Sequence, residues 1–250
     1  MQILRRLFSK RPPGPANAPI PPPRPDEPLA VIGDIHGRVD LLNLMLANLD
    51  KTHPEARKIF VGDYVDRGPD SRAVLERLHG LTDAICLIGN HEQMLLDFLD
   101  RPAENARRWL RNGGRETLAS YGIVLTSDEP DEILDASRDL ARAATNGTVD
   151  WLRSLPLHWQ SGNLLVTHAG PNPAEPIETQ PADVFTWGHS RFLRQARSDG
   201  LWVAHGHWVQ DRPAIADGRI AVDTGAWFSG RLTAALIQPD GEIRFLSSRI

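Results

Sequence analysis

The stretch GDYVDRGPDS, residues 62–71, directly follows the apolar run KIFV. It places Asp63, Asp66 and Arg67 within five residues. Asp and Gly are poor strand formers, so the apolar run ends here as a buried strand. Ionised carboxylates next to a buried strand are costly unless a cation offsets their charge. The stretch therefore predicts a strand followed at once by a charged, cation-binding loop.

The same pattern of an apolar run stopped by glycine and a polar residue recurs on either side of this stretch. LAVIGD ends in Gly33-Asp34, and AICLIGN ends in Gly89-Asn90. Apolar residues at helical spacing follow each run, in VDLLNLMLANL, SRAVLERLHG and HEQMLLDFL. Strands that alternate with helices predict βαβ units and a parallel sheet, in which ligands bind at the carboxyl ends of the strands.

The rest of the chain divides into three parts. Residues 1–28 are basic and then rich in proline, which predicts a disordered tail with at most a weak partner or membrane-surface contact. Residues 29–250 form one expected α/β domain, with a helical insertion over residues 103–156. Short late strands without long helices between them, such as NLLVTHAG and LWVAHGH, predict mixed or antiparallel pairing.

Composition excludes several classes of protein. The net charge of -4 provides no basic field for nucleic acid. No apolar run is long enough for a transmembrane segment. The single cysteine, Cys86, excludes a disulfide framework and a cysteine-rich zinc site. We therefore expect a cytoplasmic protein.

Polar motifs gather at the ends of the predicted strands. Asp, His and Asn together are ligands for divalent ions such as Mn²⁺, Fe²⁺ or Zn²⁺. A single such motif is more often a helix cap, but five in one chain favour a metal site. In chain order they are GDIHG with Asp34 and His36, GDYVDRG with Asp63, Asp66 and Arg67, GNHE with Asn90, His91 and Glu92, THAG with His168, and AHGH with His205 and His207.

GDIHG, GDYVDRG, GNHE and HAG, in this order and spacing, resemble the phosphoprotein phosphatase family of metallophosphoesterases. The chain is most similar to the short bacterial and phage-type serine/threonine protein phosphatases, and WLRNGGRETLASYG resembles a segment common in bacterial relatives. The resemblance extends from Leu29 to about Ala226. It implies the calcineurin-like metallophosphoesterase fold, a central mixed β-sandwich flanked by helices.

The resemblance also implies two divalent metal ions, for which we expect Mn²⁺, with Fe²⁺ and Zn²⁺ as alternatives. His207 is preferred to His205 because Gly206-His207 matches the late Gly-His pair of the family. The implied ligands are Asp34, His36 and Asp63 for one ion and Asp63, Asn90, His168 and His207 for the other, with Asp63 bridging both.

The same resemblance makes His91 the general acid and Asp66 its orienting partner. A metal pair generates hydroxide at neutral pH, which attacks phosphorus in line. An imidazolium held by a carboxylate can supply the proton that the leaving oxygen needs. Arg67 offers a planar fork of donors to the phosphoryl oxygens, and the Asn90 amide adds another.

Two departures from the family pattern concern the substrate. In FTWGHSRFL, His189 stands where bacterial relatives often have a phosphate-binding arginine, and Arg191 follows two residues later. We expect Arg191 to bind substrate, with His189 as the alternative. The late motif is GHWV rather than GHTP, and GHW is typical of symmetrical dinucleoside tetraphosphate hydrolases.

Three functions follow in order of preference. The first is hydrolysis of phosphoserine and phosphothreonine monoesters, which the intact Asp66 and His91 favour. The second is hydrolysis of dinucleoside polyphosphates of the diadenosine tetraphosphate type, which GHW and the substituted arginine favour. The third is a non-catalytic scaffold that docks partners through the proline-rich tail, although no expected ligand is lost.

Overall fold

Two five-stranded sheets form the centre of the molecule, which the computed structural model describes for residues 20–145 and 147–249. The first sheet has the order β10-β9-β1-β2-β3. Its middle strands β1, β2 and β3 are parallel, and β9 and β10 pair antiparallel at one edge. The strands are β1 (Leu29–Ile32), β2 (Arg57–Phe60), β3 (Ala84–Cys86), β9 (Arg231–Ile237) and β10 (Ile243–Arg249).

The second sheet has the order β4-β5-β6-β8-β7. Its three middle strands are again parallel, and an antiparallel strand pairs at each edge. The strands are β4 (His158–Ser161), β5 (Leu164–Thr167), β6 (Trp202–His205), β7 (Ala214–Ala216) and β8 (Arg219–Ala221). The predicted mixed sandwich with a parallel first half is confirmed.

Strand β1 is buried on both faces, which explains why LAVI lacks any polar residue. Leu29 and Val31 point into the sandwich, where they pack with Val166 and Ile220 of the second sheet. Their neighbours Ala30 and Ile32 point the other way, against the helices. Successive side chains of a strand alternate between its faces, so four residues serve two cores.

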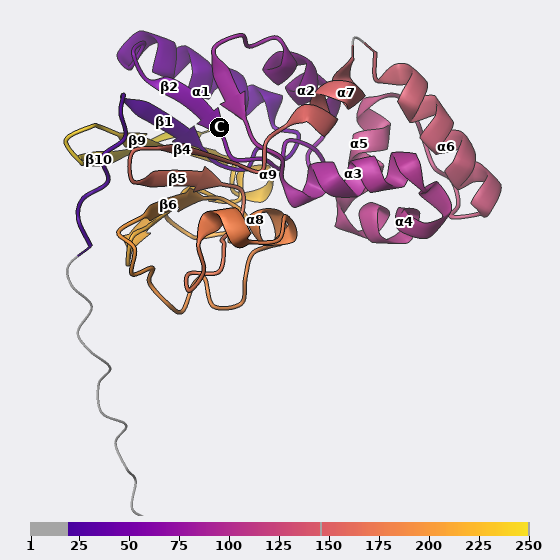
Figure 1. Ribbon diagram of the computed structural model, residues 1–250. Coiled ribbons are helices and arrows are strands. Elements are labelled where there is room, and N and C mark those ends of the chain that lie inside the picture. Colours follow the sequence, from indigo (N-terminus) through magenta and orange to yellow (C-terminus); the bar gives the residue numbers. More distant parts are fainter. Residues whose placement is uncertain (1–19, 146, 250) are drawn as a thin grey trace, which may run out of the picture.

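Helices cover the outer faces of both sheets and extend to one side as a separate group (Figure 1). The connections of the first sheet are α1 (Val39–Thr52), α2 (Ser71–His79) and α3 (Asn90–Asp100). We call residues 102–154 the helical segment. It comprises α4 (Pro102–Trp109), a π-helix η1 (Leu110–Gly114), α5 (Arg115–Ser120), α6 (Pro130–Ala143) and α7 (Thr148–Ser154). Shorter helices follow the second sheet, η2 (Ile177–Thr179), α8 (Asp183–Trp187) and α9 (Ala226–Ser229).

The prediction of a disordered tail is wrong for its last nine residues, 20–28. The Arg24 amide donates to Asn163 Oδ1 at 2.6 Å, and the Trp202 indole donates to the Pro21 carbonyl at 2.6 Å. The Asp26 amide donates to Ser161 Oγ at 2.8 Å. Proline has no amide to donate, but its carbonyl still accepts, so side chains of the second sheet bind this segment without strand pairing.

Residues 1–19, which carry the predicted partner or membrane-surface contact, lie outside the described residues. Among the described helices, none is both long and apolar enough to cross a lipid bilayer.

Candidate active site

The motif side chains lie where parallel strands of the two sheets end. Each of these side chains follows its strand within a few residues, so the parallel strands of both sheets point their carboxyl ends at a common site. Asp34 and His36 follow β1, Asp63 follows β2, Asn90 and His91 follow β3, His168 follows β5, and His207 follows β6.

The backbone is strained at this site. Six non-glycine residues of the described chain have positive φ, and five of them belong to the motifs: His36, Asp63, Asp66, Arg67 and His207. Left-handed backbone costs roughly 1–2 kcal/mol for a residue with a Cβ atom. Such strain persists where the surrounding structure fixes a side chain in one direction, which is typical of functional sites.

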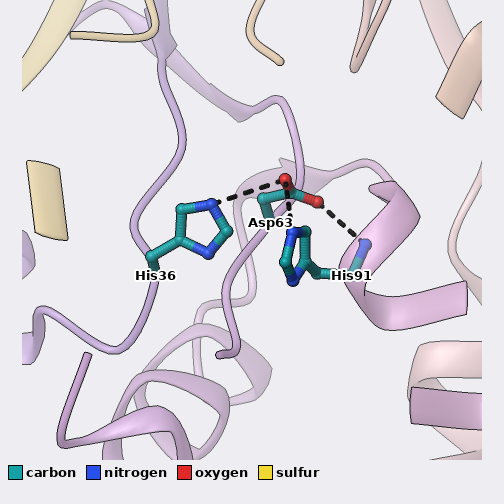
Figure 2. A group of neighbouring side chains, drawn as sticks. All are labelled: His36, Asp63 and His91. Carbon is teal, nitrogen blue, oxygen red and sulfur yellow. Dashed lines mark hydrogen bonds and ion pairs between the residues drawn. The ribbon is translucent and has the colours of Figure 1, made fainter. Parts of the chain in front are cut away.

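Asp63 and two histidines form a first buried cluster, shown in Figure 2. Asp63 Oδ2 lies 3.5 Å from His36 Nε2 and 3.9 Å from His91 Nε2. His36 Nδ1 donates to the Val65 carbonyl at 2.8 Å, which leaves its Nε2 unprotonated, with a lone pair that faces Asp63 and Arg67. A bond of this kind from the second ring nitrogen is typical of histidines that hold metal ions.

The other oxygen of Asp63 belongs to a second cluster with His168 and His207. Asp63 Oδ1 lies 3.4 Å from His168 Nε2. Asn90 Oδ1 lies 2.8 Å from His168 Nε2 and 3.0 Å from His207 Nδ1. One carboxylate therefore serves both clusters, one oxygen facing each. Both donor sets fit divalent ions that accept nitrogen and oxygen ligands.

The imidazoles that face Asp63 suit metal binding in their protonation state. Burial lowers the pKa of His36 and of His168 to about 3, so both rings are neutral at pH 7. A neutral ring keeps one nitrogen lone pair, whereas an imidazolium has none. His205 takes no part in either cluster, because its ring packs edge-on against Phe192 at 4.9 Å.

Asp34 lies beside these clusters rather than within them. Its carboxylate accepts from the His207 amide at 3.1 Å. Burial, followed by the charges of Asp223 and Asp63, raises the pKa of Asp34 well above its usual range. Two buried carboxylates in contact, Asp34 and Asp223, need added positive charge to remain ionised together. The assignment of Asp34 as a metal ligand stays a prediction.

Asp223 is a site residue that the sequence prediction missed. It follows β8, and its Oδ1 accepts from the Gly225 amide at 2.8 Å. The signal was available, because RIAVDTG repeats the pattern of an apolar run stopped by an acidic residue.

Glu92 holds the loop that carries Asp63. Its carboxylate is fully buried and accepts from the amides of Asp63 at 2.8 Å, Tyr64 at 2.7 Å and Gly89 at 2.9 Å. Burial raises the pKa of Glu92 to about 7, and these backbone donors oppose that shift by stabilising the charged form. The glutamate of GNHE thus fixes the position of Asp63 without belonging to either metal cluster.

Asp66 and His91 form a buried pair. Asp66 Oδ2 accepts from His91 Nδ1 at 2.7 Å. Two residues of the helical segment also donate to this carboxylate, Trp109 Nε1 at 3.0 Å and Thr117 Oγ1 at 2.6 Å. The WLRNGGRETL segment, whose role the sequence left open, therefore orients Asp66.

Arg67 lies between the two histidines of the first cluster. Its guanidinium lies 3.0 Å from His36 Nε2 and 2.9 Å from His91 Nε2. Burial lowers the pKa of His91, but the carboxylates of Asp63 and Asp66 outweigh it and raise the pKa above its ordinary value. A phosphoryl oxygen placed between Arg67 and a protonated His91 would receive a donor from each.

The structure does not bring Arg191 to the clusters. Its side chain is exposed, and among the described residues it has no recorded polar contact with a motif side chain. His189 is half-buried, and its Nδ1 accepts from the Arg191 amide at 3.3 Å. A substrate contact from either residue stays a prediction.

Comparison with known proteins connects this geometry to a family. The family model described as calcineurin-like phosphoesterase matches residues 27–235. Serine/threonine-protein phosphatase 1 of Salmonella typhimurium is 29% identical over 225 residues, which cover 83% of this chain and 91% of that protein. The asymmetrical bis(5'-nucleosyl)-tetraphosphatase PrpE of Geobacillus sp. is 27% identical over 232 residues, which cover 82% of this chain and 88% of that protein.

The symmetrical bis(5'-nucleosyl)-tetraphosphatase of Janthinobacterium sp. is 32% identical over 142 residues, which cover 56% of this chain and only 42% of that protein. The chain thus spans less than half of that longer relative. A solved structure titled as a putative diadenosine tetraphosphatase has a TM-score of 0.63 at 22% identity, covering 90% of this chain and 96% of its own. At this identity the likeness shows the fold.

Replacing Asp63 with asparagine tests the shared carboxylate. Asp63→Asn keeps the shape but removes the charge that both clusters share, so we expect the content of both metal ions to fall. Elemental analysis after dialysis against metal-free buffer measures it. Asp217→Asn is the matched control, because Asp217 also has positive φ but is exposed in the turn between β7 and β8. Two full equivalents of metal in Asp63→Asn would contradict the shared ligand.

Replacing Thr117 with valine tests how the helical segment orients Asp66. Thr117→Val removes one hydroxyl donor at nearly constant shape. We expect kcat to fall about tenfold, equivalent to about 1.4 kcal/mol. A less stabilised Asp66 carboxylate supports less charge on His91, so the alkaline limb of the pH profile should move to lower pH. Thr148→Val, buried at the start of α7, is the control. An unchanged pH profile in Thr117→Val would rule out this positioning role.

Proposed function

We propose that this chain, which belongs to the calcineurin-like phosphoesterase family and is a metal-dependent phosphatase, hydrolyses phosphoserine and phosphothreonine monoesters in proteins. Two divalent ions are its expected cofactors, and we propose Mn²⁺, with Fe²⁺ or Zn²⁺ as alternatives.

The buried Asp66 and His91 pair carries this proposal. A serine or threonine side chain leaves as an alkoxide, a strong base that needs a proton as the phosphorus–oxygen bond breaks. The anhydride oxygen of a polyphosphate is a weak base and leaves without one. A histidine whose pKa is raised by neighbouring carboxylates therefore suits a monoester substrate better than an anhydride.

The polar groups around the two clusters have separate parts in this reaction. Arg67 binds the phosphoryl group through its planar fork of donors, and the Asn90 amide adds a donor. Once the Arg67 guanidinium, which lies 2.9 Å from His91 Nε2, turns to the phosphoryl group, Nε2 can hold a proton for the leaving oxygen, while Asp66 fixes the ring through Nδ1. Trp109 and Thr117 hold the Asp66 carboxylate in place, so the His91 ring can turn away only by breaking its own bond to Asp66.

The proposed ligands divide between the two clusters through Asp63. When bound, two divalent ions supply Lewis acidity and lower the pKa of a coordinated water. We propose Asp34, His36 and Asp63 for one ion and Asp63, Asn90, His168 and His207 for the other.

A second candidate function is hydrolysis of dinucleoside polyphosphates. Trp227 in α9 supports it, because its ring is 41% exposed and lies 5.8 Å from the Arg67 guanidinium, where a nucleobase could stack. Two of the relatives described above are named as tetraphosphatases. The GHW motif and His189 in place of arginine point the same way.

The two functions separate in one assay. With Mn²⁺ present, kcat/KM is compared on a phosphothreonine peptide and on diadenosine tetraphosphate. Preference for the peptide supports the monoesterase, and preference for the dinucleotide assigns the chain to the second function.

Replacing His91 with asparagine tests proton donation. We expect His91→Asn to lower kcat about 10²–10⁴-fold on the phosphothreonine peptide. The loss should be much smaller on p-nitrophenyl phosphate, whose leaving group needs no proton. Wild-type activity on the peptide should fall as the pH rises through the raised pKa of His91, and this limb should vanish in the variant.

His53→Asn, at the end of α1 and outside both clusters, is the control for this test. Equal losses on both substrates would show that His91 acts as a metal ligand, and near-normal turnover of the peptide would contradict any catalytic role. Metal content measured in parallel distinguishes the loss of a metal ligand from the loss of a proton donor.

A further inference from the structure

A short stretch of the helical segment carries three arginines that no motif explains. Arg107 and Arg108 lie on α4, and Arg111 lies in η1. All three are exposed, and none forms an ion pair with any described residue. The acidic residue nearest in sequence, Glu104, already pairs with Arg101 at 3.1 Å. In a chain of net charge -4, this is a local excess of positive charge.

These arginines border two adjoining hollows. The first has a volume of about 360 Å³ and lies between α4 and α6. Arg107, Arg111 and the ion pair of Arg115 with Asp128 line it together with apolar residues, which are Ala103, Ala106, Leu110, Pro130 and Ile133. The second, of about 520 Å³, is lined by Glu104, Arg107, Arg108, Arg111 and Asn112. Arg107 and Arg111 line both, so the hollows form one continuous surface.

This surface reaches the active site by two routes. The Arg108 guanidinium lies 4.2 Å from the centre of the Trp187 ring, and that ring lies 6.4 Å from His207 of the second cluster. Along the other route, the Gly113 carbonyl in η1 accepts from the Arg67 amide at 3.3 Å. A Cβ atom on Gly113 would come within 2.5 Å of that amide, so η1 lies directly against the phosphate-binding loop.

We propose that the two hollows form a docking site for an acidic segment of the protein substrate, next to its phosphorylated residue. Carboxylates of that segment would pair with Arg107 and Arg111, and an apolar side chain would enter the first hollow. Charge complementarity and continuity with the active site support this occupant. The inference rests on the proposed monoesterase function for the identity of the substrate, whereas binding itself can be measured without turnover.

The test measures affinity for a fluorescein-labelled, unphosphorylated peptide with glutamates and one leucine. A second peptide has glutamine in place of each glutamate. We expect the wild type to prefer the acidic peptide and the double variant Arg107→Gln/Arg111→Gln to lose about five- to tenfold in affinity, since exposed ion pairs contribute little individually. The difference should shrink with added salt.

The control is Arg138→Gln/Arg142→Gln on α6, which changes the net charge equally at two exposed positions away from both hollows. Equal affinity of wild type and the Arg107 and Arg111 variant would overturn the proposal. An equal loss of affinity in the control variant would also overturn it, because the effect would then come from the overall charge of the protein. Stronger displacement of the peptide by ATP than by unlabelled acidic peptide would overturn it in favour of a nucleotide site.

Turnover then separates this inference from the proposed function. In the Arg107 and Arg111 variant, we expect KM to rise for a phosphothreonine peptide with acidic flanks, with p-nitrophenyl phosphate turnover unchanged. If phosphopeptides are hydrolysed equally well whatever their flanks, the docking site fails and the monoesterase stands. If acidic peptide binding needs the arginines but no phosphopeptide is hydrolysed, the docking site stands and the monoesterase fails.

Discussion

The position of one carboxylate, Asp63, governs the whole site. Its two oxygens face different histidine clusters, and its backbone adopts a left-handed conformation that an unconstrained aspartate avoids. Glu92 fixes that conformation by accepting from four backbone amides around it. A buried glutamate that binds only backbone donors is costly in an apolar core, but it is well suited to hold a strained loop.

The helical segment lies to one side of the sandwich in Figure 1, yet its residues contact two residues of the site directly. Trp109 and Thr117 satisfy the Asp66 carboxylate, and Gly113 contacts the backbone of Arg67. The residues that orient a proton donor and those that border the arginine surface therefore lie on the same few turns. A change in this segment can therefore disturb the Asp66 contacts and the arginine surface together.

The two-sheet architecture explains how residues far apart in the chain reach one site. Asp34 and His207 are 173 residues apart, yet the carboxylate of one accepts from the backbone amide of the other. Parallel strands in both sheets end at the same edge, and a cluster of buried apolar side chains packs between the sheets. Packing of these apolar faces aligns the loops, so the energy that holds the site together comes mainly from the core beneath it.

The sequence by itself determined the strand-and-loop pattern, because apolar runs stopped by Gly-Asp or Gly-Asn are a local signal. It also named the residues that the structure gathers in both clusters, although the choice of His207 over His205 came from the resemblance to a family. Only the tertiary structure decided that Trp109 and Thr117 bind Asp66, that Arg191 stays exposed, and that residues 20–28 are ordered on the second sheet. Each of these depends on which distant segment supplies a hydrogen-bond partner, and no local pattern encodes that.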